Sequence, residues 1–496
     1  MRACMVVMLT VFMGCRAGTD PVEVDSGVSA PVCEAPPALG KNPVTRKGLL
    51  SIDADPDDPL QTGENFVMDL LEVELIGEGG FALGVGQGGL MVFETAGAAP
   101  TFRHRIVVSD GVAEVDRFHH LAYLGGEVAA VSNRSSGLYF LDIDDPLAEP
   151  LYLNRISGQS GLAAQDERLY VVSHDGWMHT WSVADPRAPV LMASSEGLDN
   201  AWEIVTDGGY AYVASNHLGV VPVDLADPDH PSVLEPVATD GSAQDLVAYE
   251  GALYVANGAA GIAVFDLAEP AAPRLVEALD HGGSVVSVAA DDGVLWAVDH
   301  ADVLAYDVSD PLAPVPIGSY PTEEWALAVD AHGGQALVGD WGNLGLYAAA
   351  SEHPAPDARA SVETLYFYEG EEELTLELLN RGGEALALHG AAVVPAEEDA
   401  RFSVTLGEAS VAPGESVSVA VRYEGGEGEA AELCLITDDP DAPLVRAVLA
   451  TTSDDGASLA VGEAAIDFVL PDVDGEYHRL SEHLGEPIYL VYFATW

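Results

Sequence analysis

The sequence predicts a mainly β protein, in which a seven-bladed β-propeller is followed by an immunoglobulin-like β-sandwich and a truncated thioredoxin-like segment. Phrases such as VDLADPDHP and YDVSDPLAP occur five times, and their aligned prolines lie 40, 42, 42 and 41 residues apart. A propeller blade of four short strands takes about forty residues, so this period indicates one blade per repeat. The aligned prolines are Pro146, Pro186, Pro228, Pro270 and Pro311.

Each repeat has the strand pattern of an antiparallel sheet. The segment from Glu203, EIVTDGGYAYVASNHLGVVPVDL, contains two alternating apolar runs around a glycine turn and then a second turn into a third strand. A fourth strand follows the Asp-Pro turn, as in APRLVEAL. The copy from Glu127 ends in the first of the five phrases, and weaker copies from Phe81 and Ala336 lie before and after the five, which gives seven hairpins. A lone third-strand copy from Gly48, GLLSIDADPDDP, predicts a strand that closes the ring by pairing with the last blade.

The repeat phrase resembles that of the LVIVD-repeat proteins, which are exported bacterial and archaeal proteins with β-propeller folds. The resemblance covers residues 46–350. It implies a propeller in a cell-surface setting, and it implies little about biochemical activity because the role of the family is poorly defined.

Polar residues occupy the turns expected on one face of the propeller, where the second and third strands of each blade join. Two readings stay open. Asp, Asn, His and Gly are the residues that tight turns prefer, but an oxygen-rich, histidine-bearing funnel could also bind Ca²⁺, a cationic ligand or a protein. The candidate funnel residues are His174, Asp175, His217, Asp299, His300, Asp340 and Trp341.

No familiar catalytic motif occurs on the predicted propeller. The sequence lacks a calcium loop, a His-Glu-x-x-His zinc motif, a Gly-x-Ser-x-Gly nucleophile motif and a phosphate-binding glycine loop. His119 and His120 are adjacent, but neighbouring residues of a strand point to opposite faces, which makes the pair a poor chelate.

The charge of the chain excludes one class of partner. Asp and Glu total 81 against 19 Lys and Arg, for a formal net charge of −62. Such a surface repels phosphate backbones, so we expect no nucleic-acid partner.

The N-terminus predicts an exported, membrane-anchored protein. Residues 1–15, MRACMVVMLTVFMGC, have the form of an export signal, and FMGC resembles a bacterial lipobox. The resemblance implies cleavage before Cys15, acylation of its thiol and a lipoprotein of the outer membrane or cell surface. The alternatives are an ordinary signal and a misassigned start. Residues 16–45 then predict a flexible tether. Cys33 and Cys434 could pair, or Cys434 could be a buried small apolar residue.

Residues 358–453 predict a second β domain. About seven short strands in roughly ninety-five residues match the size of an immunoglobulin-like sandwich. The blocks NRGGEALAL, VAPGESVSVAV and LITDDPDAPLVRAVL resemble immunoglobulin-like domains of the ASH and choice-of-anchor type, which implies a spacer or adhesive module.

Residues 461–496 resemble the start of redoxin domains, the thioredoxin-like oxidoreductases and peroxidases. In that family a segment like FATW is followed at once by Cys-x-x-Cys, so the resemblance places the nucleophile immediately after Trp496 and none within this chain. Glu486 stands where the family usually has Lys. The matching residues are Gly462, Asp467, Phe468, Leu470, Pro471, Asp472, Gly475, Gly485 and Pro487.

Three explanations of this ending stay open: a sequencing frameshift or contig end, a degenerate gene, and an internal stop codon read as selenocysteine. The sequence therefore predicts an envelope lipoprotein that joins a propeller binding module to a thioredoxin-like segment truncated before its thiol or selenol. The alternative is a non-enzymatic surface binding or adhesion protein.

Overall fold

The computed structural model describes seven stretches of the chain, which form parts of two compact units. The larger unit comprises Asn42–Ala355 with Arg381–Glu384, and the other comprises Met1–Lys41, Pro356–Asn380 and Ala385–Trp496. Cys15, Cys33 and Trp496 lie outside the described residues, as do most of the predicted tether and redoxin segment. The described residues are 6–8, 44–51, 69–349, 355–451, 469–471, 477–479 and 491–493, except 78, 79, 110–113, 116, 146–148, 280, 281, 363, 368–371, 396–400, 407, 408, 425–429, 441 and 442.

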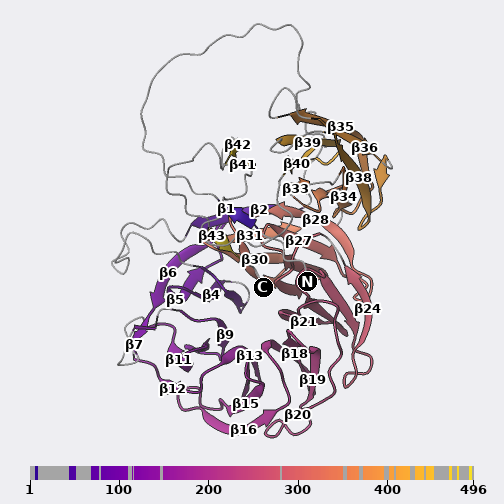
Figure 1. Ribbon diagram of the computed structural model, residues 1–496. Helices are drawn as coiled ribbons and strands as arrows, with labels where there is room; N and C mark the ends of the chain where they lie inside the picture. Colours follow the sequence, from indigo (N-terminus) through magenta and orange to yellow (C-terminus); the bar gives the residue numbers. More distant parts are fainter. Residues whose placement is uncertain are drawn as a thin grey trace, which may run out of the picture. The chain divides into compact units, whose positions relative to one another are not determined.

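The described part of the larger unit contains seven four-stranded antiparallel sheets arranged in a ring (Figure 1). Six of them are built from four consecutive strands, so each repeat of the sequence forms one sheet. From the innermost strand outward, the first three sheets contain β3 (Glu72–Ile76), β4 (Phe81–Gly86), β5 (Gly89–Glu94) and β6 (Thr101–Ile106); β9 (His120–Tyr123), β10 (Val128–Asn133), β11 (Gly137–Asp142) and β12 (Tyr152–Asn154); and β13 (Gln159–Gln165), β14 (Arg168–Ser173), β15 (Trp177–Ser182) and β16 (Val190–Glu196).

The remaining sheets follow the same plan, and a short hairpin of β7 (Val108–Ser109) and β8 (Glu114–Val115) follows the first sheet. They contain β17 (Ala201–Asp207), β18 (Tyr210–Ser215), β19 (Gly219–Asp224) and β20 (Ser232–Val233); β21 (Asp245–Tyr249), β22 (Ala252–Ala256), β23 (Ile262–Asp266) and β24 (Arg274–Leu279); β25 (Ser287–Asp291), β26 (Val294–Val298), β27 (Asp302–Asp307) and β28 (Val315–Pro321); and β29 (Ala326–His332), β30 (Gln335–Asp340), β31 (Asn343–Ala349) and β2 (Val44–Ser51).

The ring closes in two places. At its centre, each innermost strand contacts the innermost strand of the next sheet, and β29 contacts β3. At its periphery, β2 pairs antiparallel with β31 from Val44 opposite Ala349 to Ser51 opposite Asn343. The predicted closing strand is thereby confirmed. It covers an edge of β31 that would otherwise expose unpaired backbone groups.

The core of the ring lies between neighbouring sheets. All five residues of β22 are buried, because sheets on both sides cover its two faces. Its Tyr254 packs in one cluster with Leu304 of the next sheet, and Leu253 packs in another cluster with Tyr212 of the preceding sheet. Burial on both faces explains why the second and third strands are nearly continuous apolar runs, and not the alternating runs that the sequence analysis expected.

The repeated Asp-Pro phrase has two structural roles. Asp224 Oδ1 accepts a hydrogen bond from the backbone N–H of Ala226 at 2.8 Å, which fixes the turn after the third strand. The Tyr254 hydroxyl donates to the carbonyl oxygen of Pro311, in the phrase of the following repeat, at 2.8 Å. The phrase therefore both shapes a turn and joins adjacent sheets.

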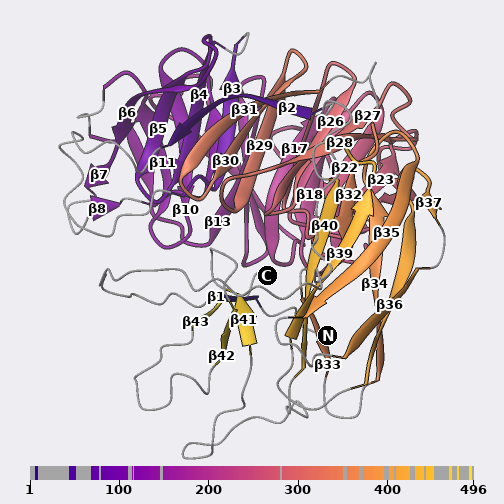
Figure 2. The same cartoon turned by 90° about the horizontal axis from the view of Figure 1, so that it is seen from above.

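The smaller unit contains two sheets that share one hydrophobic core (Figure 2). Leu376 and Val419 of one sheet and Leu433 and Leu449 of the other belong to that core. The described residues give nine strands here, two more than the sequence suggested, because β32 and β37 are too short to show an alternating pattern. The sheets are β32 (Ala358–Ala360), β34 (Glu373–Asn380), β38 (Ser416–Tyr423) and β36 (Phe402–Leu406), and β33 (Thr364–Phe367), β40 (Leu444–Thr451), β39 (Ala430–Thr437), β35 (Leu386–Pro395) and β37 (Ser410–Val411).

Two small pairs complete the described strands of this unit. β1 (Val6–Met8) pairs with β43 (Val491–Phe493), and β41 (Val469–Pro471) pairs with β42 (Tyr477–Arg479). The described residues contain no helix long and apolar enough to cross a membrane.

Cys434 lies on β39 and is fully buried. It is disulfide-bonded, so it is more than a small apolar residue. The chain has four cysteines, and the other three, Cys4, Cys15 and Cys33, lie outside the described residues.

The Tyr254→Phe substitution should lower the free energy of unfolding of the ring by about 1 kcal/mol, because it leaves the Pro311 carbonyl without its donor. Urea unfolding followed by tryptophan fluorescence measures this, since six of the seven tryptophans lie between residues 177 and 341. Tyr139→Phe is the matched control. The Tyr139 hydroxyl is buried without a hydrogen-bond partner, so its removal should not destabilise the ring. Equal losses in the two variants would contradict the assigned role.

Candidate functional site

The innermost strands carry carboxylates that bind the backbone of the next sheet. An innermost strand pairs with only one strand of its own sheet, so every second N–H points away from the ladder and needs another acceptor. Side chains of the neighbouring innermost strand provide it. The donors and acceptors are Leu121 N–H to Glu72, Tyr123 N–H to Glu74, Val288 N–H to Asp245 and Leu75 N–H to Asp330, at 3.2, 2.9, 2.9 and 2.6 Å.

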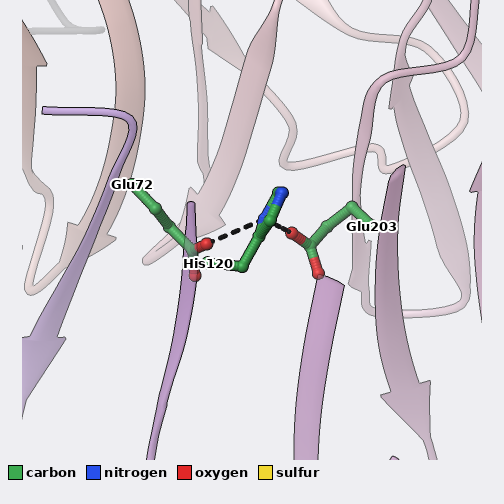
Figure 3. A group of neighbouring side chains, drawn as sticks. All are labelled: Glu72, His120 and Glu203. Carbon is green, nitrogen blue, oxygen red and sulfur yellow. Dashed lines mark hydrogen bonds and ion pairs between the residues drawn. The ribbon is translucent and has the colours of Figure 1, made fainter. Parts of the chain in front are cut away.

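Three of these inner side chains converge in what we call the central cluster: Glu72, His120 and Glu203 (Figure 3). His120 Nδ1 lies 2.7 Å from Glu203 Oε2 and 3.0 Å from Glu72 Oε2. One ligand atom from each residue lies within 4.8 Å of the other two. The three side chains are 25%, 13% and 14% exposed, so they interact in a largely water-excluded setting.

The electrostatics of the central cluster follow from this geometry. Burial alone would lower the pKa of His120, but the charges and hydrogen bonds of Glu203 and Glu72 outweigh it and raise that pKa to about 10. Burial and then the charge of Glu203 raise the pKa of Glu72 to about 8. The arrangement can hold protons on buried groups or bind a cation between them.

His119 lies in a different environment from its neighbour. Burial and the charge of Arg134 lower its pKa to about 3. The sequence analysis did not find the partners that His120 does have, because Glu203 lies 83 residues further along the chain.

The predicted funnel residues lie in the turns between second and third strands, and several hold those turns together. Asp340 Oδ1 accepts the backbone N–H groups of Gly342 and Asn343 at 3.0 and 2.6 Å. Asp175 Oδ1 accepts the Ser173 hydroxyl at 2.5 Å. These carboxylates do what turn residues ordinarily do.

Asp299 also accepts a backbone N–H of its own turn, and in addition it forms an ion pair. Its Oδ1 accepts the N–H of Asp302 at 2.8 Å. Its Oδ2 lies 3.0 Å from Arg381 Nη2, in the short segment Arg381–Glu384 of the larger unit, and both side chains are almost completely buried. Asp299 therefore has partners within its own unit.

The other funnel residues form smaller groups. His217 Nδ1 lies 3.2 Å from Asp199 Oδ2, and both side chains are well exposed. The His174 ring contacts Trp202 edge-on, with 5.1 Å between centroids. The rings of His300 and Trp341 both lie against Trp325, at 5.4 and 5.7 Å. In the described chain, none of the seven belongs to a group of three metal-ligating side chains. Calcium binding at this face stays a prediction.

The repeats and the ring of four-stranded sheets define a β-propeller repeat protein. The LVIVD repeat family matches residues 199–239 and 240–281. Among solved structures, "Structure of U3-55K" aligns with 61% of this chain and 98% of its own, at 12% identity and a TM-score of 0.50. "Crystal structure of RRP9 WD40 repeats" aligns with 62% of this chain and all of its own, at 11% identity and a TM-score of 0.49. Similarity at such identity concerns the fold alone.

Two curated relatives match a short stretch of the chain. They are the thiol-disulfide oxidoreductases ResA of Geobacillus thermodenitrificans (strain NG80-2) and Geobacillus kaustophilus (strain HTA426), at 44% and 46% identity over 39 residues. The stretch is 8% of this chain, and the chain spans 22% of the length of each relative.

The stability of the ring should fall as pH rises from about 4 to 7. Burial raises the pKa of Asp330 to about 6 and that of Asp245 to about 7, from 3.8. In that window these two carboxyl groups hold more protons in the folded ring than in the unfolded chain, so at about 1.36 kcal/mol per pKa unit they remove about 3 and 4 kcal/mol of stability as pH rises. Thermal unfolding at pH 5 and pH 8 measures this.

The Asp330→Asn variant should flatten the lower part of this pH dependence. The control is Asp207→Asn, at an exposed position of β17, which should leave the dependence unchanged. A melting temperature that rises from pH 5 to pH 8 would contradict the prediction.

Proposed function

We propose that this chain is an exported bacterial envelope protein in which a seven-bladed propeller acts as a binding module attached to a redoxin-type thiol–disulfide oxidoreductase segment. The match to two thiol-disulfide oxidoreductases over 39 residues carries the redox part of the proposal. The resemblance of residues 461–496 to the start of redoxin domains agrees with it. The seven sheets and the LVIVD repeats support the propeller part.

Export and a surface location are part of the same proposal. Disulfides persist in oxidising compartments and are rare in the cytosol, so the disulfide of Cys434 favours an exported chain. The two sheets that share a core in the smaller unit form an immunoglobulin-like spacer in this proposal. Acylation of Cys15 would attach the protein to the membrane, and the propeller would bind a ligand or protein partner at its turn face.

The redox proposal is tested on the natural gene product, including any residues that follow Trp496 in it. Disulfide reduction, measured with insulin and a thiol donor, should occur and should disappear when the cysteine or selenocysteine residues of the redoxin segment are replaced by serine. The control is a Cys434→Ser variant. It should retain the activity because Cys434 lies on β39 of the two-sheet domain and not in the redoxin segment. Absence of activity in the natural product would leave the second candidate function.

That second candidate is a surface binding or adhesion protein without redox chemistry. One observation favours it: Cys434, the only cysteine in the described part of the chain, is in a disulfide rather than a free thiol. In that case the propeller and the two-sheet domain perform the whole function through binding.

The Cys15→Ser variant should move the protein from the membrane fraction to the soluble fraction, because acyl chains on Cys15 are the proposed anchor. Fractionation and immunoblotting of cells that express each form measure this. The control is Cys33→Ser, which should remain with the membrane. Membrane retention of Cys15→Ser would show that the anchor lies elsewhere.

A further inference from the structure

The central cluster joins three different sheets of the ring. Glu72 comes from β3, His120 from β9 and Glu203 from β17. β13 lies between β9 and β17 in the ring, so Glu203 reaches His120 past an intervening sheet. A contact of this kind needs space on β13, since an ordinary side chain there would separate the two residues.

Gly161 on β13 provides that space. A Cβ atom at this position would meet Glu203 Oε1, lie 2.5 Å from Glu203 Cα and lie 2.8 Å from the Trp202 carbonyl oxygen. The backbone of Gly161 is not in the left-handed region, so its conformation alone does not require glycine. The absence of a side chain at Gly161 allows β17 to approach closely and Glu203 to extend to the cluster.

The central cluster has more hydrogen-bond acceptors than hydrogens to donate. Both carboxylates approach the same nitrogen of His120, yet that nitrogen has at most one hydrogen to donate. Their other contacts are made along the backbone, since Glu72 Oε2 also accepts Leu121 N–H and Glu203 Oε1 accepts Ile204 N–H. Two carboxylate oxygens and one imidazole nitrogen that converge on a single point suit a cation.

Charge favours the same occupant. Glu72 and Glu203 repel each other, and Asp245 of β21 lies close enough to Glu203 to be affected by its charge. With Glu72 and Glu203 both ionised and His120 neutral, a divalent cation between them would offset two negative charges in a setting with little water, where such interactions are strong.

We propose that Glu72, His120 and Glu203 bind one divalent transition-metal ion of the zinc type. Imidazole nitrogen and carboxylate oxygen are both zinc ligands, at about 2.0–2.2 Å, and three protein ligands leave a further position for water or a ligand. Calcium is a poorer fit because it prefers six to eight oxygen ligands. This site is distinct from the turn residues considered above, and it does not depend on the redox proposal.

Zinc titration of the purified full chain tests the site, with calorimetry in excess magnesium to occupy exposed carboxylates. The wild type should bind one Zn²⁺ per chain, and zinc should raise the melting temperature of the ring through selective binding to the folded state. His120→Gln, Glu72→Gln and Glu203→Gln should each weaken zinc binding by at least about tenfold, because each removes a ligand.

Glu74→Gln is the matched control. Glu74 lies on the same strand as Glu72 and also accepts an N–H from β9, but it is not part of the cluster. The Glu74→Gln variant should bind zinc with the affinity of the wild type. The glutamine variants are close in size to glutamate, and circular dichroism shows whether they fold. If one variant fails to fold, the zinc content after dialysis is compared between the wild type and the variants that do fold. The proposal requires zinc in the wild type and none in those variants.

Three outcomes would overturn the proposal. One is a wild type that holds no zinc under these conditions, which would leave the cluster as a closed ion pair. Another is zinc binding that Glu72→Gln and Glu203→Gln leave unchanged. The third is a cluster that binds Ca²⁺ and not Zn²⁺.

Discussion

The ring depends on how the backbone of its innermost strands is satisfied. Each of these strands is the edge of its own sheet, with N–H groups that point away from the ladder. Unpaired N–H groups in a buried place are costly, so acceptors must come from outside the sheet. The side chains of the neighbouring innermost strand supply them, and each such hydrogen bond also joins one sheet to the next. Glu74 with Tyr123, and Asp330 with Leu75, do this on either side of the first sheet.

This solution has an electrostatic consequence. Carboxylates are strong acceptors, but placing several of them around one axis brings like charges together in a poorly solvated region. Burial raises the pKa of Glu74 to about 8, and the nearby charge of Asp330 adds to that effect. The same constraint that holds the sheets together thus makes the centre of the ring attract cations. His120, within reach of two carboxylates, is the place where that tendency is most concentrated.

The sequence predicts those features that are local or periodic. The Asp-Pro phrase recurs because most copies make the same turn, in which the aspartate accepts an N–H two residues on, as Asp224 does. Two copies also accept a tyrosine hydroxyl from the preceding sheet, Pro270 from Tyr212 and Pro311 from Tyr254. The closing strand could be predicted from a lone copy of the third strand near Gly48. Two short strands of the smaller unit, β32 and β37, could not be, since three and two residues cannot display a period.

The central cluster could not be predicted from the sequence because none of its residues is unusual where it stands. Glu72 begins a strand, Glu203 lies within one, and His120 has a histidine beside it that draws attention to the wrong pair. The turn aspartates stood out instead, and Asp340 largely serves its own turn. A sequence signal nonetheless existed in Gly161. Glycine inside a strand indicates the close approach of another backbone or a ligand, and here it lies beside Glu203. In a repeat architecture, a glycine on one innermost strand therefore predicts that a side chain of the next blade passes over it, as Glu203 passes over Gly161.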